Sequence, residues 1–248
     1  MKKVIILRHV DCEGPGYLLD VFQRKGIPYE IVKIDEGDVI PTSTDHMLAL
    51  VSMGGSMSAN DDLPWISAEL SLLRSAADKG LPILGHCLGA QLLAKVLGGE
   101  ITANPVREIG WFDVSLEKNK EAEHWFSGLP ESFGVFHWHG ETFSTPPNAQ
   151  NILSSAHCEN QCFVQGNILG FQCHIEMTAA LVKEWAQRFK NEIDSSSATE
   201  QSSDFLVMEL DSRITALNKA ADTIYERWIS TFAQINPRIL LINKEREN

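Results

Sequence analysis

The sequence lacks the long apolar segments that a membrane protein or a secreted precursor requires. Its longest apolar runs, such as residues 4–7 and 49–51, are far shorter than the roughly 20 residues of a membrane-spanning helix. The apolar stretch after the basic N-terminus is interrupted at once by Arg8 and Asp11, so it cannot form the core of a signal peptide. We therefore expect no membrane association and a cytoplasmic location.

Basic residues and cysteines are also scarce. The chain has 21 Lys and Arg against 33 Asp and Glu, a formal charge of −12, and a surface of that sign repels nucleic acid. The five cysteines are an odd number without a C-x-x-C pair, in a chain of 248 residues that needs no covalent crosslinks. We expect no nucleic-acid partner, no disulfide framework and no zinc ribbon. A cysteine with a function should act as a free thiol.

Phosphate-binding glycine motifs are missing as well. The chain has neither a G-x-x-x-x-G-K-[S/T] loop, which would bind a nucleoside triphosphate, nor a G-x-G-x-x-G turn of the dinucleotide-binding type. It therefore has no visible means of activating an acceptor with ATP, and we expect it to use no cofactor.

The chain does have the composition of one compact globular body, with 44% hydrophobic and 22% charged residues. Its first half alternates short β-branched runs with helical stretches, the pattern of β-α-β units around a parallel sheet. The predicted strands are 4–9, 29–34, 48–53 and 82–85, and the predicted helices are 16–25, 64–79 and about 90–97. Four parallel strands are thus expected before residue 87.

The second half predicts an antiparallel extension of the sheet and two further helices. The strand-like runs are 111–116, 134–139, 152–156, 162–165 and 168–175, and the helices are 178–193 and about 204–235. We divide the chain into a domain of residues 1–192 and a C-terminal loop and helix, 193–248, packed on that domain. Apolar residues at helical spacing from Leu210 to Trp228 predict core packing, with a homodimer contact as the open alternative.

The segment Gly85-His86-Cys87-Leu88-Gly89 lies between a predicted buried strand and a helix. Small residues two positions before and after the thiol suit a sharp strand-turn-helix, so the pattern is typical of a nucleophile elbow with cysteine in place of serine. Such a turn exposes the side chain at the carboxyl end of the sheet, and the N-terminus of the following helix favours the thiolate. Taken alone, a buried structural cysteine is the more common explanation.

Residues 170–176 favour the catalytic interpretation. If 168–175 is a strand, Gln172, His174 and Glu176 share one face, because side chains alternate along a strand. An imidazole and a carboxylate then emerge together, as a general base and the group that orients it would. A structural histidine beside a surface glutamate is the alternative. The combination with the elbow favours Cys87, His174 and Glu176 as catalytic residues.

The order and spacing of these groups resemble the class I glutamine amidotransferases, Cys-His-Glu enzymes that release ammonia from glutamine. The resemblance covers about residues 1–190 and is nearest to free-standing members similar to the glutaminase domain of GMP synthase. Its motifs are E-G-P-G at 13–16, M-G-G-x-M at 53–57, G-x-C-x-G-x-Q at 85–91, N-P-V-R-E-I-G-W at 104–111, H-W-H-G-E at 137–141 and H-x-E at 174–176. His86 and Ile175 depart from the family's usual aliphatic residue and proline, and neither change removes a reacting group.

The resemblance implies a three-layer α/β sandwich, flavodoxin-like in its mostly parallel sheet, with an antiparallel extension and the site at the carboxyl ends of the strands. It also implies that Gly55 and Leu88 supply the backbone N–H groups of an oxyanion hole. Gln91, one helical turn beyond Cys87, would contact the substrate. A loop would bind the amino-acid end of glutamine through its backbone: Trp138, His139, Gly140 and Glu141.

Other candidate groups are assigned no part in the reaction. His137 and His139 are two residues apart on a predicted strand, but we expect no metal, because an ion there would bind and silence the thiolate. Arg107 and Glu108 are expected to form an ion pair at the pocket entrance. Three cysteines are expected to have no catalytic role: Cys12, Cys158 and Cys162.

The expected function is hydrolysis of the glutamine side-chain amide through a γ-glutamyl thioester on Cys87, with ammonia passed to an unknown, separate synthase. Two alternatives stay open. A hydrolase of γ-glutamyl peptides would share the acyl half of the substrate and differ only in the leaving amine. A non-catalytic binding or regulatory module would keep the elbow as a structural turn, which the presence of all three reacting residues argues against.

Overall fold

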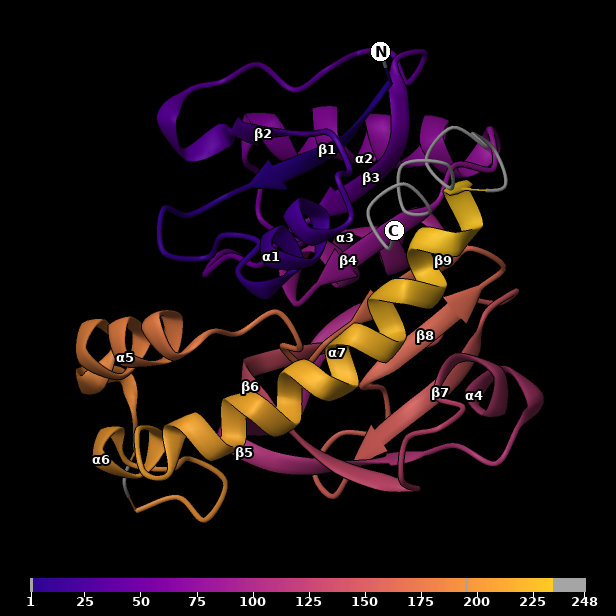
Figure 1. Ribbon diagram of the computed structural model, residues 1–248. Helices are drawn as coiled ribbons and strands as arrows, with labels where there is room; N and C mark the ends of the chain where they lie inside the picture. The colour runs from indigo at the N-terminus through magenta and orange to yellow at the C-terminus, as the bar shows by residue number, and fades with distance from the viewer. Residues whose placement is uncertain (1, 195, 234–248) are drawn as a thin grey trace.

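The computed structural model describes residues 2–194 and 196–233, and its centre is a nine-stranded mixed sheet (Figure 1). The strand order is β2-β1-β3-β4-β9-β8-β7-β5-β6. The first four strands are parallel, as the β-α-β pattern predicts: β1 (Lys3–Arg8), β2 (Tyr29–Lys33), β3 (Met47–Ser52) and β4 (Ile83–His86). Every residue of β3 and β4 is buried, which explains why these strands are continuous apolar runs rather than alternating ones.

The second half of the sheet is the expected antiparallel extension. Its strands are β5 (Ile101–Leu116), β6 (Ser132–Phe143), β7 (Gln150–Ser155), β8 (Cys162–Gln165) and β9 (Ile168–Phe171). Strand β9 joins the two halves, since it pairs parallel with β4 and antiparallel with β8. The carboxyl ends of β4 and β9 therefore lie side by side, and the residues that follow each strand meet at one edge of the sheet.

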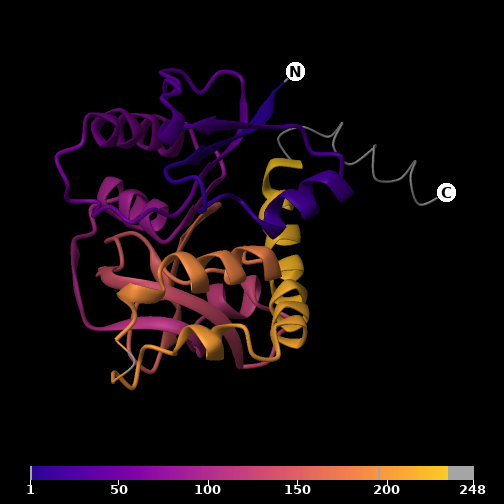
Figure 2. The ribbon, with the colours of Figure 1, turned by 90° about the vertical axis from the view of Figure 1, so that its left-hand side faces the viewer.

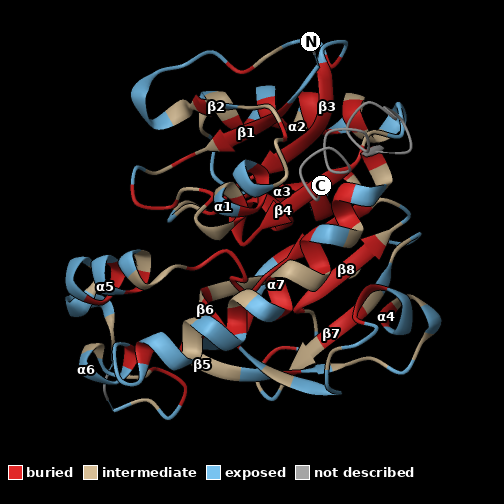
Figure 3. Ribbon diagram, in the orientation of Figure 1, coloured by how far each residue is buried: buried red, intermediate tan, exposed pale blue. Residues whose placement is uncertain are grey.

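Helices cover both faces of the sheet and complete three layers (Figures 1 and 2). One apolar core joins one sheet face to α2 (Pro64–Asp78) and α3 (Leu88–Val96), and the other joins the opposite face to α1 (Tyr17–Arg24), α5 (Ala179–Arg188) and α7 (Leu210–Ala233). The short elements are η1 (Ile34–Glu36), α4 (Lys120–Trp125), η2 (Lys190–Glu192) and α6 (Ser203–Leu206). Buried residues gather in the strands and on the inner helix faces (Figure 3). Among the described helices, none has the length and apolar character needed to cross a bilayer.

The predicted strand 168–175 is too long, because β9 ends at Phe171. Beyond that residue the backbone changes partners: the Gln172 nitrogen donates to the Gln161 carbonyl, and the His174 nitrogen donates to the Phe136 carbonyl of β6. Since each bond goes to a different segment, no ladder continues. The chain stays near the sheet edge and carries residues 172–176 past the carboxyl end of β4.

The predicted helix 204–235 is also interrupted. It consists of α6 and α7, with Glu209 between them in a left-handed conformation, φ 51; Ile235 lies outside the described residues. Helix α7 crosses one face of the sheet (Figure 1) and buries its apolar stripe there: Leu210, Leu217, Ala221, Ile224 and Trp228. The stripe thus packs on the body of its own chain. The division at residue 192 and the homodimer stay predictions.

Candidate active site

Cys87 occupies the turn between β4 and α3. Its φ of 48° is left-handed, a conformation that is uncommon for residues with a side chain and that often marks functional sites. The neighbouring glycines let the turn close: a Cβ on Gly89 would collide with the Ser52 carbonyl oxygen, and one on Gly85 would lie 2.7 Å from the Ala90 nitrogen. The predicted strand-turn-helix is therefore present with Cys87 at its apex, although α3 begins at residue 88 rather than 90.

The thiol of Cys87 faces a cleft of about 290 Å³. Only 7% of the residue is exposed; its Sγ lies 3.9 Å from the Trp138 carbonyl oxygen, and Gln172 Nε2 donates to Sγ at 3.7 Å. The other thiols lie outside the cleft lining. Burial raises the pKa of each of these thiols: Cys12, Cys158, Cys162 and Cys173. For Cys12 the pKa rises to about 11. These four thiols are therefore poor nucleophiles at neutral pH.

His174 and Glu176 come together beside this cleft. Nδ1 of His174 lies 2.6 Å from Glu176 Oε1, and the ring packs perpendicular to that of Trp185. Burial by itself lowers the pKa of His174, but Glu176 and Cys87 outweigh it and raise this pKa well above its usual value. Nε2 of His174 is buried without a hydrogen-bond partner among the described atoms. The ring is thus oriented by a carboxylate and keeps one nitrogen available for a proton.

His86 lies on the far side of Glu176. Its Nδ1 is 3.1 Å from Glu176 Oε2, and its Nε2 is 3.5 Å from the hydroxyl of Tyr225 in α7. Burial lowers the pKa of His86, although the charge of Glu176 acts in the opposite direction. Burial would raise the pKa of Glu176, but His86 and His174 hold it at about 2. Sequence reasoning noted His86 only as a departure from the family and missed both contacts.

The segments around Gly55, Leu88 and Gln91 border the thiol. Gly55 follows β3 and lines the cleft, and a Cβ there would lie 2.7 Å from Leu88 Cδ2, so a side chain at this position would force Leu88 to shift. Leu88 is the first residue of α3, where a backbone N–H has no partner inside the helix. Gln91 is buried, lines the cleft and donates from Nε2 to Gln172 Oε1 at 3.1 Å, which holds Gln172 beside the thiol.

Residues 138–141 line the cleft, but the prediction that they form a loop was wrong. They belong to β6, where His139 pairs with Glu108 and Glu141 pairs with Ala103. The register shifts between these two pairs, and Gly140 has no partner in the described pairing. The regular pairing of β6 with β5 is therefore interrupted where the strand borders the cleft.

The side chains of this strand segment point in different directions. Trp138 packs against the rings of Trp185 in α5 and of Phe189 directly after it, which form an apolar wall of the cleft. Glu141 Oε1 accepts a hydrogen bond from Ser58 Oγ at 3.0 Å. Sequence reasoning missed Trp185 and Phe189, although their spacing of four residues on a predicted helix places them on one face.

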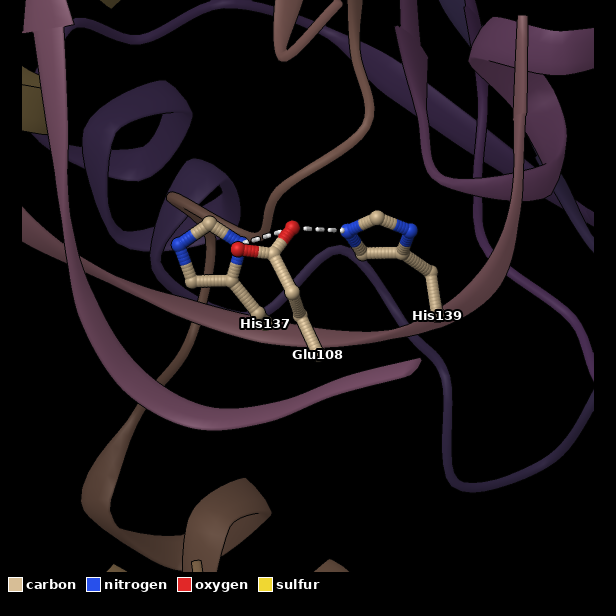
Figure 4. Close-up of side chains that lie close together, drawn as sticks. All are labelled: Glu108, His137 and His139. Carbon is tan, nitrogen blue, oxygen red and sulfur yellow. Dashed lines mark hydrogen bonds and ion pairs between the residues drawn. The ribbon is translucent and has the colours of Figure 1, made fainter. Parts of the chain in front are cut away.

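A second buried cluster consists of Glu108, His137 and His139, which we call the β5–β6 cluster (Figure 4). Glu108 Oε2 lies 2.9 Å from His139 Nε2 and 3.8 Å from His137 Nδ1. The predicted ion pair between Arg107 and Glu108 is wrong, because adjacent strand residues point to opposite faces. Arg107 instead lies 3.7 Å from Glu200, while Glu108 is buried.

Glu13 reaches the cleft from the segment after β1. Burial raises the pKa of this carboxyl to about 7, although His174 acts in the opposite direction. Its carboxylate also approaches Gly54, where a Cβ would collide with Oε2. Sequence reasoning placed Glu13 in a motif of the family but gave it no role, because it lies far from His174 along the chain.

Known proteins match most of this chain. The family model for glutamine amidotransferase class-I matches residues 10–189. A glutamine amidotransferase-like protein of Salmonella typhimurium is 26% identical over 197 residues, covering 77% of this chain and 82% of that protein. A glutamine-hydrolysing GMP synthase of Thermomicrobium roseum is 35% identical over 102 residues, covering 40% of this chain and 19% of that protein. The match to the GMP synthase of Aeropyrum pernix spans 28% of that protein's length.

Solved structures match over nearly the full length. A glutamine amidotransferase from Methylobacillus flagellatus has a TM-score of 0.89 at 40% identity, covering 93% of this chain and 95% of that one. A glutamine amidotransferase from Thermotoga maritima has a TM-score of 0.83 at 30% identity, covering 92% and 98%. The chain therefore belongs to the class I glutamine amidotransferases, a family of enzymes that hydrolyse glutamine with a cysteine nucleophile.

Proposed function

We propose that the protein hydrolyses the side-chain amide of free glutamine with Cys87 as nucleophile, His174 as general base and acid, and Glu176 as the group that orients the imidazole. The observation that carries this proposal is the position of Cys87 at a left-handed elbow, facing a cleft beside the His174–Glu176 pair. A purely structural turn has no need for an oriented imidazole next to it.

In the acylation step, Nε2 of His174 takes the thiol proton and Sγ attacks the amide carbon of glutamine. The developing oxyanion is met by the backbone N–H groups of Gly55 and Leu88, of which the second lies at the N-terminus of α3. His174 then gives its proton to the leaving nitrogen, the carbon–nitrogen bond breaks, and ammonia departs. A γ-glutamyl thioester on Cys87 remains.

In the second step, water replaces ammonia. His174 takes a proton from water, hydroxide adds to the thioester carbon, and the carbon–sulfur bond breaks to give glutamate. His174 returns its proton to the leaving sulfur, which restores the Cys87 thiol. Glu176 stabilises the imidazolium in both steps, which its low pKa of about 2 supports, because the carboxylate stays ionised.

The amino-acid end of glutamine would lie against residues 138–141 and Gln91, which border the same cleft as the thiol. The irregular pairing at Gly140 would let its backbone groups bind the substrate, and the Glu141 carboxylate has the charge that an α-ammonium group requires. We propose a separate synthase as the ammonia acceptor, because the chain is similar to glutamine-hydrolysing GMP synthases.

The test compares glutamine with glutathione and a γ-glutamyl amide on the purified protein. We expect glutamine to have the highest kcat/KM and to be hydrolysed slowly in the absence of an acceptor enzyme. The Cys87→Ala variant is the control for contaminating glutaminases, and a small residue suits its turn. A preference for the peptide of more than about tenfold, or ~1.4 kcal/mol in transition-state binding, would replace this proposal by a γ-glutamyl peptide hydrolase.

A further inference from the structure

The β5–β6 cluster contains buried polar atoms that a fully satisfied hydrogen-bond network would not have. Both ring nitrogens of His137 are buried without a hydrogen-bond partner among the described atoms, and so is Gln161 Oε1. The side chains of Glu108 and His137 have no exposed surface, and that of His139 has 1%. Buried polar atoms without partners cost free energy, and each one requires an explanation such as an ion.

The hydrogen bonds of His139 indicate which of its ring nitrogens carries the proton and which one faces Glu108 with a lone pair. Nδ1 of His139 is 3.0 Å from the Glu141 carbonyl oxygen, which can only accept, so the proton is on Nδ1. Nε2 then presents a lone pair to Glu108 Oε2, 2.9 Å away. Two lone pairs at that distance repel unless a second proton or a cation lies between them.

We propose that Glu108, His137 and His139 form a binding site for a divalent transition-metal ion, with Zn²⁺ the best match. The ligand atoms are His139 Nε2, Glu108 Oε2 and His137 Nδ1, which all lie within 4.8 Å of one another (Figure 4). Two imidazoles and a carboxylate are a donor set that zinc prefers. A metal ligand histidine also commonly donates its other N–H to a backbone carbonyl, as His139 does to Glu141.

The distances suit an ion after a small contraction. Zinc bonds of about 2.1 Å with tetrahedral angles place ligand atoms roughly 3.4 Å apart. The two distances from Glu108 Oε2, 2.9 Å to His139 and 3.8 Å to His137, lie on either side of that value.

Neighbouring groups complete the site. Ser155 Oγ donates to Glu108 Oε1 at 2.7 Å and fixes the carboxylate, and Ser155 also lines a cavity of about 660 Å³. The amide of Gln161 lies 2.7 Å from Glu108 Oε2; turning this amide over brings its oxygen to the site as a fourth ligand.

This site leaves the Cys87 thiol free. The sequence-based argument against a metal, that the ion would bind and silence the thiolate, therefore does not apply to it. The third ligand is Glu108 rather than Cys87, and Cys87 is not among the converging ligand atoms. The ion would connect β5 to β6 next to Trp138, whose carbonyl faces the thiol. Its role is structural, since it fixes the strand that forms one side of the cleft, and the proposal does not depend on the identity of the substrate.

The test measures zinc in the full-length protein after exposure to Zn²⁺ and gel filtration in metal-free buffer, by mass spectrometry of the metal. We expect about one zinc per chain and an increase in Tm of about 5–10 °C on zinc loading. His137→Phe should lose the zinc and the increase in Tm, and His124→Gln, a change at an exposed histidine outside the cluster, should keep both.

The direction of the Tm change in His137→Phe distinguishes a zinc site from a proton-bridged ion pair. If zinc is bound, the variant has a lower Tm than the zinc-loaded protein. If the cluster is only a proton-bridged ion pair, the variant removes an unsatisfied buried ring next to Phe112 and has an equal or higher Tm. Absence of zinc from the loaded wild-type protein, or zinc retained by the variant, would overturn the proposal.

Discussion

Two buried carboxylates in this protein each lie between two histidines. One group, which we call the catalytic cluster, is Glu176 with His174 and His86; the other, the β5–β6 cluster, is Glu108 with His139 and His137. The two groups contain the same residue types at similar distances and differ in what surrounds them. Composition alone therefore does not decide what such a group can do.

The difference lies in the second nitrogen of the histidine nearest to each carboxylate. In the catalytic cluster that nitrogen, His174 Nε2, has no hydrogen-bond partner among the described atoms, and the Cys87 thiol is close enough to raise the pKa of the ring. In the β5–β6 cluster it is His139 Nδ1, which the Glu141 carbonyl already occupies. The first histidine can move a proton to a substrate, and the second can only hold a position.

Replacing the histidine nearest to each carboxylate should give the largest difference in activity between the two clusters. His174→Ala should lower kcat for glutamine about 10³-fold, because it removes the proposed acceptor of the thiol proton. His139→Ala removes a group that only supports β6 and should lower kcat less than about 30-fold. Steady-state kinetics of both variants, with circular dichroism to check folding, measures the difference. Equal losses would mean that His174 is not the base.

Neutralising the carboxylates should lower kcat less than replacing the histidines does. The catalytic cluster should again show the larger loss. Glu176→Gln keeps a hydrogen-bond acceptor for His174 but removes the charge that stabilises the imidazolium, so kcat should fall about 10²-fold. Glu108→Gln should change kcat less than Glu176→Gln. A Glu176→Gln variant with nearly full activity would limit the role of Glu176 to packing.

The outer histidine of the catalytic cluster should affect catalysis through Glu176. His86→Phe removes a group that lowers the pKa of Glu176, so this pKa should rise and the acid limb of the kcat–pH profile should move to higher pH. We expect a loss of about tenfold in kcat with little change in KM. Tyr225→Phe, which removes only the hydroxyl near His86, is the matched control and should lose less than threefold. An unshifted pH profile would assign His86 to packing alone.

Glu13 should affect stability more than the other carboxyl groups at the cleft. Its pKa of about 7 lies above the usual 4.5, so its stabilising contribution is complete below pH 4.5 and is lost as the pH rises through 7. Glu13→Gln imitates the neutral carboxyl and should become more stable than wild type between pH 5.5 and 8, by up to about 3 kcal/mol. Urea unfolding at both pH values measures this, and parallel pH dependences would contradict it.

The sequence predicts local geometry well where one short rule applies. The four parallel strands follow from apolar runs separated by helices. The Cys87 elbow follows from the flanking glycines, because any residue with a Cβ at those positions would collide with the backbone. The proximity of His174 to Glu176 follows from their spacing of two, although β9 ends before both residues. These predictions need no knowledge of distant contacts.

The rest depends on contacts between segments far apart in sequence. His86 meets Tyr225, and Glu13 meets the cleft, only because the chain folds back, and no local pattern encodes either contact. Glu108 is a different case. Side-chain alternation along its strand indicates that Arg107 and Glu108 point apart, so the rule that found His174 and Glu176 could also have excluded the predicted ion pair.

The central claim is that Cys87 is the only one of the five cysteines that reacts with a glutamine-like substrate. The most direct measurement is labelling of the native protein with an electrophilic glutamine analogue, followed by peptide mass spectrometry. We expect one label per chain, on Cys87, with loss of labelling in the presence of excess glutamine and in His174→Ala. Preferential labelling of another cysteine (Cys12, Cys158, Cys162 or Cys173), or labelling that glutamine does not reduce, would contradict the account.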